Sequence, residues 1–291
     1  MKSLSMKRLA IAGGILFLCG AIVCVIAFGI AGWDYKKLST RAPLEQKSAV
    51  YDNTNQNITL FDSNVKVTVN KSNDDKIHID YQESEDLHYT ITTTPDVIKF
   101  EKKDDYEWYQ HLFIIHFEWP SVTIFLPDDY SGILDLTTSN DRVELKNIDT
   151  SNNITIKTSN ARINLEDVTA NKIDVQTSNG RVDLENIKAN KIDVQTSNGR
   201  IQAKNTESLS STELKTSNGN INITSLKSNG DIVLRTSNGD IGGSIIGNKD
   251  DYKITSHTSN SSNNIPSVTP VGYTKNLTAT TSNGKINIQF V

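Results

Sequence analysis

The chain has 291 residues, a formal net charge of −4 and only two cysteines, and hydrophobic residues make up 36% of it. After the first 33 residues it holds 27 basic residues (the 30 of the chain less Lys2, Lys7 and Arg8) against 34 acidic ones, a net charge of −7. This balance argues against nucleic-acid binding, since phosphates attract basic proteins. Both cysteines, Cys19 and Cys24, lie near the N-terminus, which excludes a disulfide framework for the rest of the chain.

The first predicted element is a membrane span. An uncharged stretch at 9–33 follows a short basic segment at 1–8, and its 25 residues exceed the roughly 20 that a helix needs to cross a bilayer. We expect a single transmembrane helix, with 1–8 cytoplasmic and the C-terminal part outside the cytoplasm. A cleaved signal peptide is the alternative, with Ala-Phe-Gly at 27–29 as the cleavage site, but the apolar run is long for such a signal.

The next part of the chain changes from a polar linker to β pattern. Residues 34–49 are polar and are expected to be a linker. In residues 50–131, short runs alternate between apolar and polar side chains, as in Val-Lys-Val-Thr-Val at 65–69. Such alternation is typical of half-buried strands. These runs are less regular than those that follow, so we expect 50–131 to form an irregular first part of a β domain.

An aromatic insertion interrupts this part at 104–120. It holds six of the chain's aromatic residues, of which there are 3 Trp, 9 Tyr and 8 Phe in all. We expect its apolar centre to form part of a hairpin that caps the β domain. Exposed aromatic rings here are the alternative, because Trp and Tyr contact sugars, partner proteins or membrane surfaces. The candidates for such contacts are Trp108, Tyr109 and Trp119.

From residue 132 to 291 the tripeptide Thr-Ser-Asn recurs eight times, at steps of 19 to 23 residues. Apolar residues stand four and two positions before each Thr and five and seven positions after it, with few exceptions. A period near 20 residues is typical of a solenoid, in which stacked coils bury a shared core that one coil cannot cover alone. We therefore predict an all-β, single-domain parallel β-helix, or β-solenoid, with about 20 residues per coil.

The Ser-Asn-Gly segment is the predicted corner of each coil, because Asn and Gly tolerate the backbone of a sharp turn. We expect the Asn side chains to form a structural ladder between neighbouring coils. An active-site role is disfavoured, since a catalytic residue occurs once per site and not eight times. Residues 257–272 are expected to loop out before a last coil at 274–291. The predicted ladder consists of Asn140, Asn160, Asn179, Asn198, Asn218, Asn238, Asn260 and Asn283.

These features resemble the bacterial putative-adhesin family, long described as a domain of unknown function. The matching features are Val-Thr-Ile-Phe-Leu-Pro at 122–127, Leu-Asp-Leu-Thr-Thr-Ser-Asn at 134–140 and the repeated coils, and the resemblance covers about 50–291. It implies a membrane-anchored β-solenoid outside the cytoplasm, similar to surface proteins of the Gram-positive cell envelope. It brings no catalytic residues with it.

One column of the repeat carries arginine in four consecutive coils, at Arg142, Arg162, Arg181 and Arg200. Coils lie about 4.8 Å apart, so these cations would repel one another unless acids neutralise them. The same strands carry acids two and four positions further on, such as Glu144 and Asp183. The column is thus either a self-compensating surface or a flat site for a polyanion or acidic glycan.

We expect a non-enzymatic surface protein, an adhesin or envelope scaffold, whose membrane contact is 9–33 and whose partner is an envelope protein or glycan. No Ser-His-Asp set, cysteine nucleophile or phosphate-cradling loop is evident, and no pattern predicts a metal or cofactor. One alternative is an accessory sensor or regulator of the envelope-stress response that acts through a membrane partner. A more remote one is a polysaccharide-active β-helix enzyme, which needs clustered carboxylates or a calcium site on one face.

Overall fold

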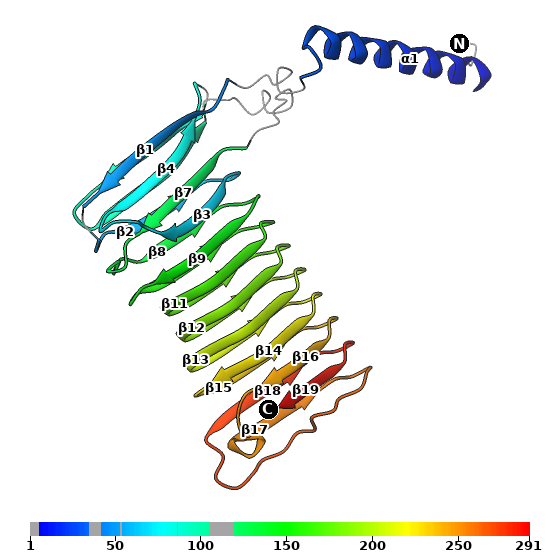
Figure 1. Cartoon of the computed structure of the whole chain (residues 1–291). Helices are drawn as coiled ribbons and strands as arrows, with labels where there is room; N and C mark the ends of the chain where they lie inside the picture. Colours follow the sequence, from blue (N-terminus) through cyan, green and yellow to red (C-terminus); the bar gives the residue numbers. More distant parts are fainter. Residues whose placement is uncertain (1–5, 35–41, 53, 86, 105–118) are drawn as a thin grey trace.

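The described part of the chain forms one apolar helix and one long β-solenoid (Figure 1). The computed structural model describes residues 6–34, 42–52, 54–85, 87–104 and 119–291. The helix α1 (Met6–Ile30) has 25 residues, and its segment Ala10–Ile30 is long and apolar enough to cross a membrane. Large apolar side chains such as Leu16 and Phe17 stay exposed along it, as expected for a helix whose partner is lipid.

The remaining regular structure is almost entirely β-sheet, as the alternation predicted. Strand β1 begins at Glu45, so the segment expected to be linker up to residue 49 ends earlier. The strands are β1 (Glu45–Tyr51), β2 (Asn57–Phe61), β3 (Lys66–Lys71), β4 (Ile77–Glu83), β5 (Leu87–Thr93), β6 (Val97–Asp104), β7 (Ser121–Leu126), β8 (Leu134–Thr137), β9 (Val143–Asp149), β10 (Asn153–Lys157), β11 (Ile163–Gln176), β12 (Val182–Gln195), β13 (Ile201–Lys215), β14 (Ile221–Ser228), β15 (Asp231–Arg235), β16 (Ile241–Ile245), β17 (Tyr252–His257), β18 (Lys275–Thr280) and β19 (Ile286–Phe290).

Successive coils pair in parallel, and equivalent residues lie over one another. Ile154 pairs with Ile173, and Ile173 pairs with Ile192, so the repeat of the sequence becomes a column of stacked side chains. These three side chains are fully buried. Since each buried Ile or Leu contributes roughly 1.5–3 kcal/mol, every coil added to these columns stabilises the stack. The β-solenoid prediction is confirmed.

The Thr-Ser-Asn segment forms the corner of each coil, and the Asn side chains form the predicted ladder. Each Nδ2 donates to the Oδ1 of the Asn in the neighbouring coil at 2.5–2.7 Å, as from Asn198 to Asn179. The ladder has a ninth member, Asn64, which accepts from Asn140. It belongs to the segment Asp62-Ser63-Asn64, in which Asp stands where the later coils have Thr. Because of this Asp, the segment does not match the Thr-Ser-Asn repeat. The coil of β2 and β3 therefore lies within 50–131, the range expected to be irregular.

A second corner lies on the other side of the coil and was not anticipated. Five residues at equivalent positions have left-handed backbone, with φ between 49° and 56°. Asn and Asp adopt this conformation more readily than most other residues, and four of the five are Asn or Asp. Their side chains also bond from coil to coil, as from Asn186 Nδ2 to Asp167 Oδ1 at 2.9 Å. The five residues are Asn147, Asp167, Asn186, Asn205 and Ser225.

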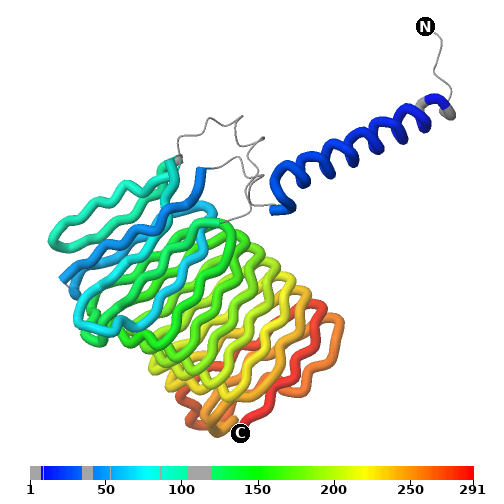
Figure 2. The backbone as a smooth tube through the Cα atoms, turned by 45° about the horizontal axis from the view of Figure 1, so that its top comes forward, coloured from blue at the N-terminus to red at the C-terminus, as the bar shows by residue number. Residues whose placement is uncertain are grey.

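The C-terminal coil does not lie at the end of the stack. β18 pairs with β15 on one side and with β17 on the other, and β19 pairs with β16. The chain thus skips one level after β16, forms the terminal level with β17, and returns to fill the vacant level with its last strands (Figure 2). The loop between them covers the outer edge of β17, where Val268 and Ile254 exchange two backbone hydrogen bonds.

The N-terminal end has the same interleaved arrangement. The coil of β2 and β3 lies between the coil of β8 and β9 and the coil of β6 and β7. Beyond it the pairing becomes antiparallel, since β4 pairs with β7, β1 with β4, and β5 with β6. The antiparallel strands therefore end the column of parallel coils. The aromatic hairpin expected over 104–120 falls on residues that lie mostly outside the described part.

Close stacking at the corner requires glycine. A Cβ at Gly199 would lie 1.8 Å from the carbonyl oxygen of Gly180 in the next coil, which is far inside van der Waals contact. By contrast, a Cβ at Gly242 meets only the Asn287 carbonyl oxygen, at 3.4 Å. We therefore expect Gly199→Ala to lower the free energy of unfolding by several kcal/mol, because two backbones must separate.

The matched control for this prediction is Gly242→Ala, a glycine-to-alanine change in a strand with room for the methyl group. It should change stability by less than about 1 kcal/mol. Chemical denaturation of the purified chain, followed by circular dichroism, measures both. Equal midpoints for the two variants would contradict the close-contact account.

Candidate binding groove along the Thr-Ser corner

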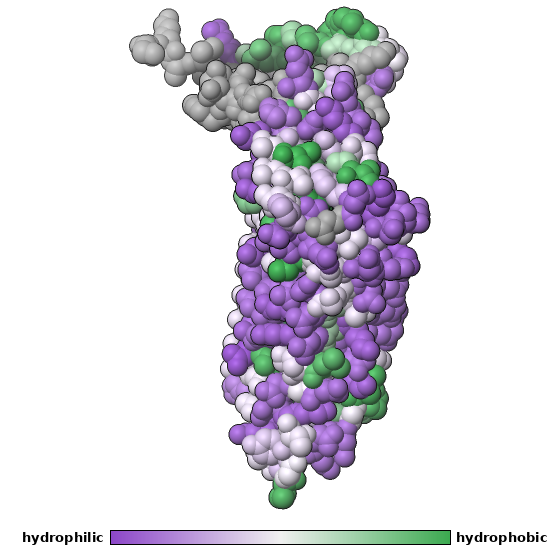
Figure 3. All heavy atoms as spheres, turned by 90° about the vertical axis from the view of Figure 1, so that its left-hand side faces the viewer, coloured by the Kyte–Doolittle hydropathy of each residue, from purple (hydrophilic) through white to green (hydrophobic). Residues whose placement is uncertain are grey.

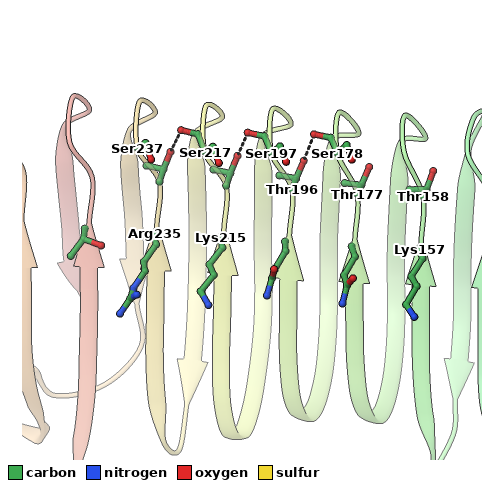
Figure 4. Close-up of a pocket in the computed structure, with 15 residues that line it drawn as sticks. Lys157, Thr158, Thr177, Ser178, Thr196, Ser197, Lys215, Ser217, Arg235 and Ser237 are labelled. Carbon is green, nitrogen blue, oxygen red and sulfur yellow. Dashed lines mark hydrogen bonds between the residues drawn. The ribbon is translucent and has the colours of Figure 1, made fainter.

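A groove with a volume of about 660 Å³ follows the Thr-Ser corner across successive coils (Figure 4). It forms where each strand of one face ends, because the last side chain of the strand points outward while the next residue, Thr, turns inward. One wall is the residue before each Thr, and the other is the Ser after it. The first wall consists of Lys157, Gln176, Gln195, Lys215, Arg235 and Thr280, and the second includes Ser178, Ser197, Ser217 and Ser237.

The threonines at the bottom of the groove are used by the fold. Thr196 Oγ1 accepts from the N–H of Gly199 at 3.1 Å and donates to the carbonyl of Gly180 at 3.2 Å. The same pair of bonds recurs at Thr216 and Thr236. These hydroxyls are therefore engaged with backbone and largely buried. The groups that face solvent in the groove are the Ser hydroxyls and the side chains of the other wall.

The wall of the groove carries cations whose pairing differs from coil to coil. Lys215 forms an ion pair with Glu213, two residues earlier. Two residues before Lys157 and Arg235 the chain instead has Thr155 and Val233, which are uncharged. Within the described part of the chain, neither cation has an ion pair. Gln176 and Gln195, at the same position, donate to Asp174 and Asp193 at 3.2 and 3.3 Å.

The arginine column predicted from the sequence is present, and most of its charge is paired. Arg162 donates two bonds to Asp183, from Nε at 3.1 Å and from Nη2 at 3.0 Å. Arg181 Nε donates to the other oxygen of Asp183 at 2.6 Å, and Arg142 pairs with Glu144 at 3.2 Å. Arg200 is exposed and has no ion pair among the described residues. The column as a binding face stays a prediction, with little unpaired charge to support it.

Of the three predicted aromatic contacts, Trp108 and Tyr109 lie outside the described residues. Trp119 is 50% exposed and borders a hollow of about 270 Å³, together with Asn64, Asn140 and Asp141. It thus lies at the first step of the Asn ladder, away from the groove. As a contact residue, Trp119 also stays a prediction.

A buried ionic cluster, not foreseen from the sequence, occupies the corner of the β2–β3 coil. Asp62 has a fully buried side chain, accepts from the Tyr89 hydroxyl at 2.5 Å and from the N–H of Asn64 at 2.8 Å, and lies 3.6 Å from Lys102 Nζ. Burial in this site, together with the Asp62 charge, raises the pKa of Tyr89. The sequence signal was the Asp in place of Thr before Ser63-Asn64. The cluster is satisfied internally, which makes it part of the fold.

Residues that could hold a metal do not converge. Within the described ranges there is no group of three or more His, Cys, Asp or Glu side chains with suitable geometry. The lateral surface that Figure 3 shows is mainly hydrophilic, with scattered apolar side chains, and its one extended hydrophobic area lies over α1. The groove lies on this polar surface, and its volume of about 660 Å³ exceeds the 270 Å³ of the hollow beside Trp119.

Comparison with known families agrees with this architecture. A family model described as Toastrack DUF4097 matches residues 55–290. The chain belongs to the Toastrack family. This domain of unknown function is a β-solenoid, so the resemblance drawn from the Thr-Ser-Asn coils is confirmed. The Toastrack domain here follows an N-terminal helix that could serve as a single-pass membrane anchor.

Solved structures resemble the chain at low sequence identity and low TM-score. A putative adhesin from Parabacteroides distasonis is 16% identical with a TM-score of 0.41, and the match covers 84% of this chain and 97% of that one. A putative adhesin from Bacteroides fragilis is 12% identical with a TM-score of 0.36, over 85% and 97% of the two chains. No curated protein matches the Toastrack chain.

The buried tyrosines predict how stability changes at alkaline pH. An unfolded tyrosine ionises near pH 10, whereas burial raises the pKa of Tyr89 in the folded state. The stabilising effect is thus complete below pH 10 and is lost as the pH rises further, by about 1.4 kcal/mol per pH unit for each such tyrosine. Burial also raises the pKa of Tyr252 to about 12, so more than one tyrosine contributes.

Tyr89→Phe isolates one of these contributions. The variant should be less stable at pH 8, because Asp62 loses a hydrogen bond, but its unfolding free energy should fall less steeply above pH 10. Denaturant midpoints measured between pH 8 and 11 give both slopes. Parallel curves for the two proteins would show that Tyr89 does not hold its proton in the folded state.

Proposed function

We propose that this Toastrack protein is a non-enzymatic surface protein, anchored by α1, which displays the solenoid outside the cytoplasm and holds an extended partner along the groove. The observation that carries the proposal is the groove itself, which crosses successive coils and is walled by hydroxyls, amides and cations. A recess of this length suits a chain-like partner laid along the stack. It is the geometry that an adhesin or an envelope scaffold requires.

The chemistry of the lateral faces supports binding over catalysis. The acids of the arginine column are held by neighbouring cations, as Asp183 is by Arg162 and Arg181. Most glycoside hydrolases use two carboxylates that flank the bond to be cleaved. The groove walls contain neither Asp nor Glu, and no His or Cys either. A non-enzymatic role is therefore the one that these residues favour.

The first test is the orientation of the chain in the membrane. The native cysteines Cys19 and Cys24 both lie in α1, so a cysteine introduced elsewhere is the sole one in a polar region. We expect Thr269→Cys, in the exposed loop of the solenoid, to react with a membrane-impermeant maleimide on intact cells that produce the full chain. Ser3→Cys, before the helix, should react only after the membrane is permeabilised. The reverse labelling pattern would refute the proposed orientation.

A second test asks whether the groove is occupied at the cell surface. Ser217 is exposed in the groove wall, and Ser217→Cys changes a single atom. We expect this cysteine to react more slowly on intact cells than in the purified chain, because a bound partner shields it. Thr269→Cys is the matched control and should react at similar rates in both states. Equal rates for Ser217→Cys in the two states would mean that no partner lies in the groove.

A further inference from the structure

We propose that the groove binds a linear anionic polymer, a hydroxylated chain bearing carboxylate or phosphodiester groups, which lies parallel to the solenoid axis. This inference rests on the proposed function and names the chemical class of its partner.

The direction of the groove determines the shape of the ligand. Lys157, at one end, and Arg235, near the other, are separated by four coil steps of about 4.8 Å, or about 19 Å. A compact small molecule would contact only one or two coils. A polymer can place a unit against each coil in turn, and the regular rows of side chains repeat the same contacts along it (Figure 4).

The walls offer charge and hydrogen bonds in separate rows. Lys157 and Arg235 have no acidic partner among the described residues, so no salt bridge has to break when an anion approaches them. Lys215 lies between these two cations in the same row, and it forms an ion pair with Glu213. Facing this row, exposed hydroxyls such as Ser197 and Ser217 can donate and accept, which suits the hydroxyl groups of a sugar or polyol.

The absent side chains exclude other partners. No aromatic residue lines the groove, so the stacking on which binding of neutral sugar rings often relies is not available. An added peptide strand needs an open sheet edge, and the strands beside the groove are already paired on both sides, as β12 is with β11 and β13. The remaining chemistry is that of an anionic, hydroxyl-bearing chain.

The protein itself supplies the substitutions for a test. Glutamine already occupies the cation position at Gln176 and Gln195, so glutamine is compatible with this column of the fold. The groove variant is the triple change Lys157→Gln, Lys215→Gln and Arg235→Gln. The control variant, with the same loss of three positive charges, changes three lysines that pair with acids outside the groove: Lys146→Gln, Lys204→Gln and Lys227→Gln.

Binding of the full chain in detergent is measured against polygalacturonate, poly(glycerol phosphate) and neutral dextran. We expect at least one anionic polymer to bind more tightly than dextran, with an affinity that falls as salt is added. The groove variant should weaken this binding about tenfold, and the control variant should leave it nearly unchanged. The double change Gln176→Lys and Gln195→Lys should strengthen it. The two anionic polymers distinguish a carboxylate ligand from a phosphodiester ligand.

Three results would overturn the inference: dextran binding as tightly as the anionic polymers, an equal loss of binding in both triple variants, or no anionic polymer retained at low salt. If Ser217→Cys is still shielded on intact cells in that case, the proposed function stands and only the ligand class is wrong. If Thr269→Cys is not accessible from outside, the proposed function itself is wrong, whatever the polymers do.

Discussion

The direct stacking of one coil on the next is the constraint on which the rest of this structure depends. Backbones approach so closely at the Thr-Ser-Asn corner that a Cβ at Gly199 would overlap a carbonyl of the coil below. The same spacing brings each Asn side chain within hydrogen-bond distance of its counterpart, and it places Ile over Ile in the core. The groove follows from it as well, because identical corners in register leave one continuous recess.

A feature of this fold can be predicted from the sequence when it repeats from coil to coil. The Thr-Ser-Asn corner recurs eight times in the sequence, and the core columns and the Asn ladder recur with it, so their periods can be found without coordinates. The cluster around Asp62 occurs once, and it joins residues far apart in the chain that no pattern connects. The interleaved ends were also beyond prediction, since a period gives the number of coils and not the order in which they stack.

The groove cannot be predicted from the sequence for a different reason. The arginine column is conspicuous because it is uniform, but uniform charge in adjacent coils persists only when acids such as Asp183 neutralise it. The groove wall is varied, with Lys, Gln and Arg at one position, and so resembled an ordinary exposed column. Whether this wall can bind an anion depends on which coils lack an acid two residues earlier, as at Thr155 and Val233. It also depends on the recess beside the wall. Neither is a property of the repeat itself.

The interleaved ends have a consequence for how such a rod changes length. At both ends of the stack the coils are not stacked in chain order, so an extra coil added at a chain terminus would have no unpaired coil beside it to stack on. Each middle coil, by contrast, has equivalent residues in the coils above and below it. Residues 170–181 and 189–200 are identical over all 12 positions and lie in adjacent coils. Duplication in the middle would lengthen the rod by about 4.8 Å per coil and extend the groove with it, while both ends stay intact.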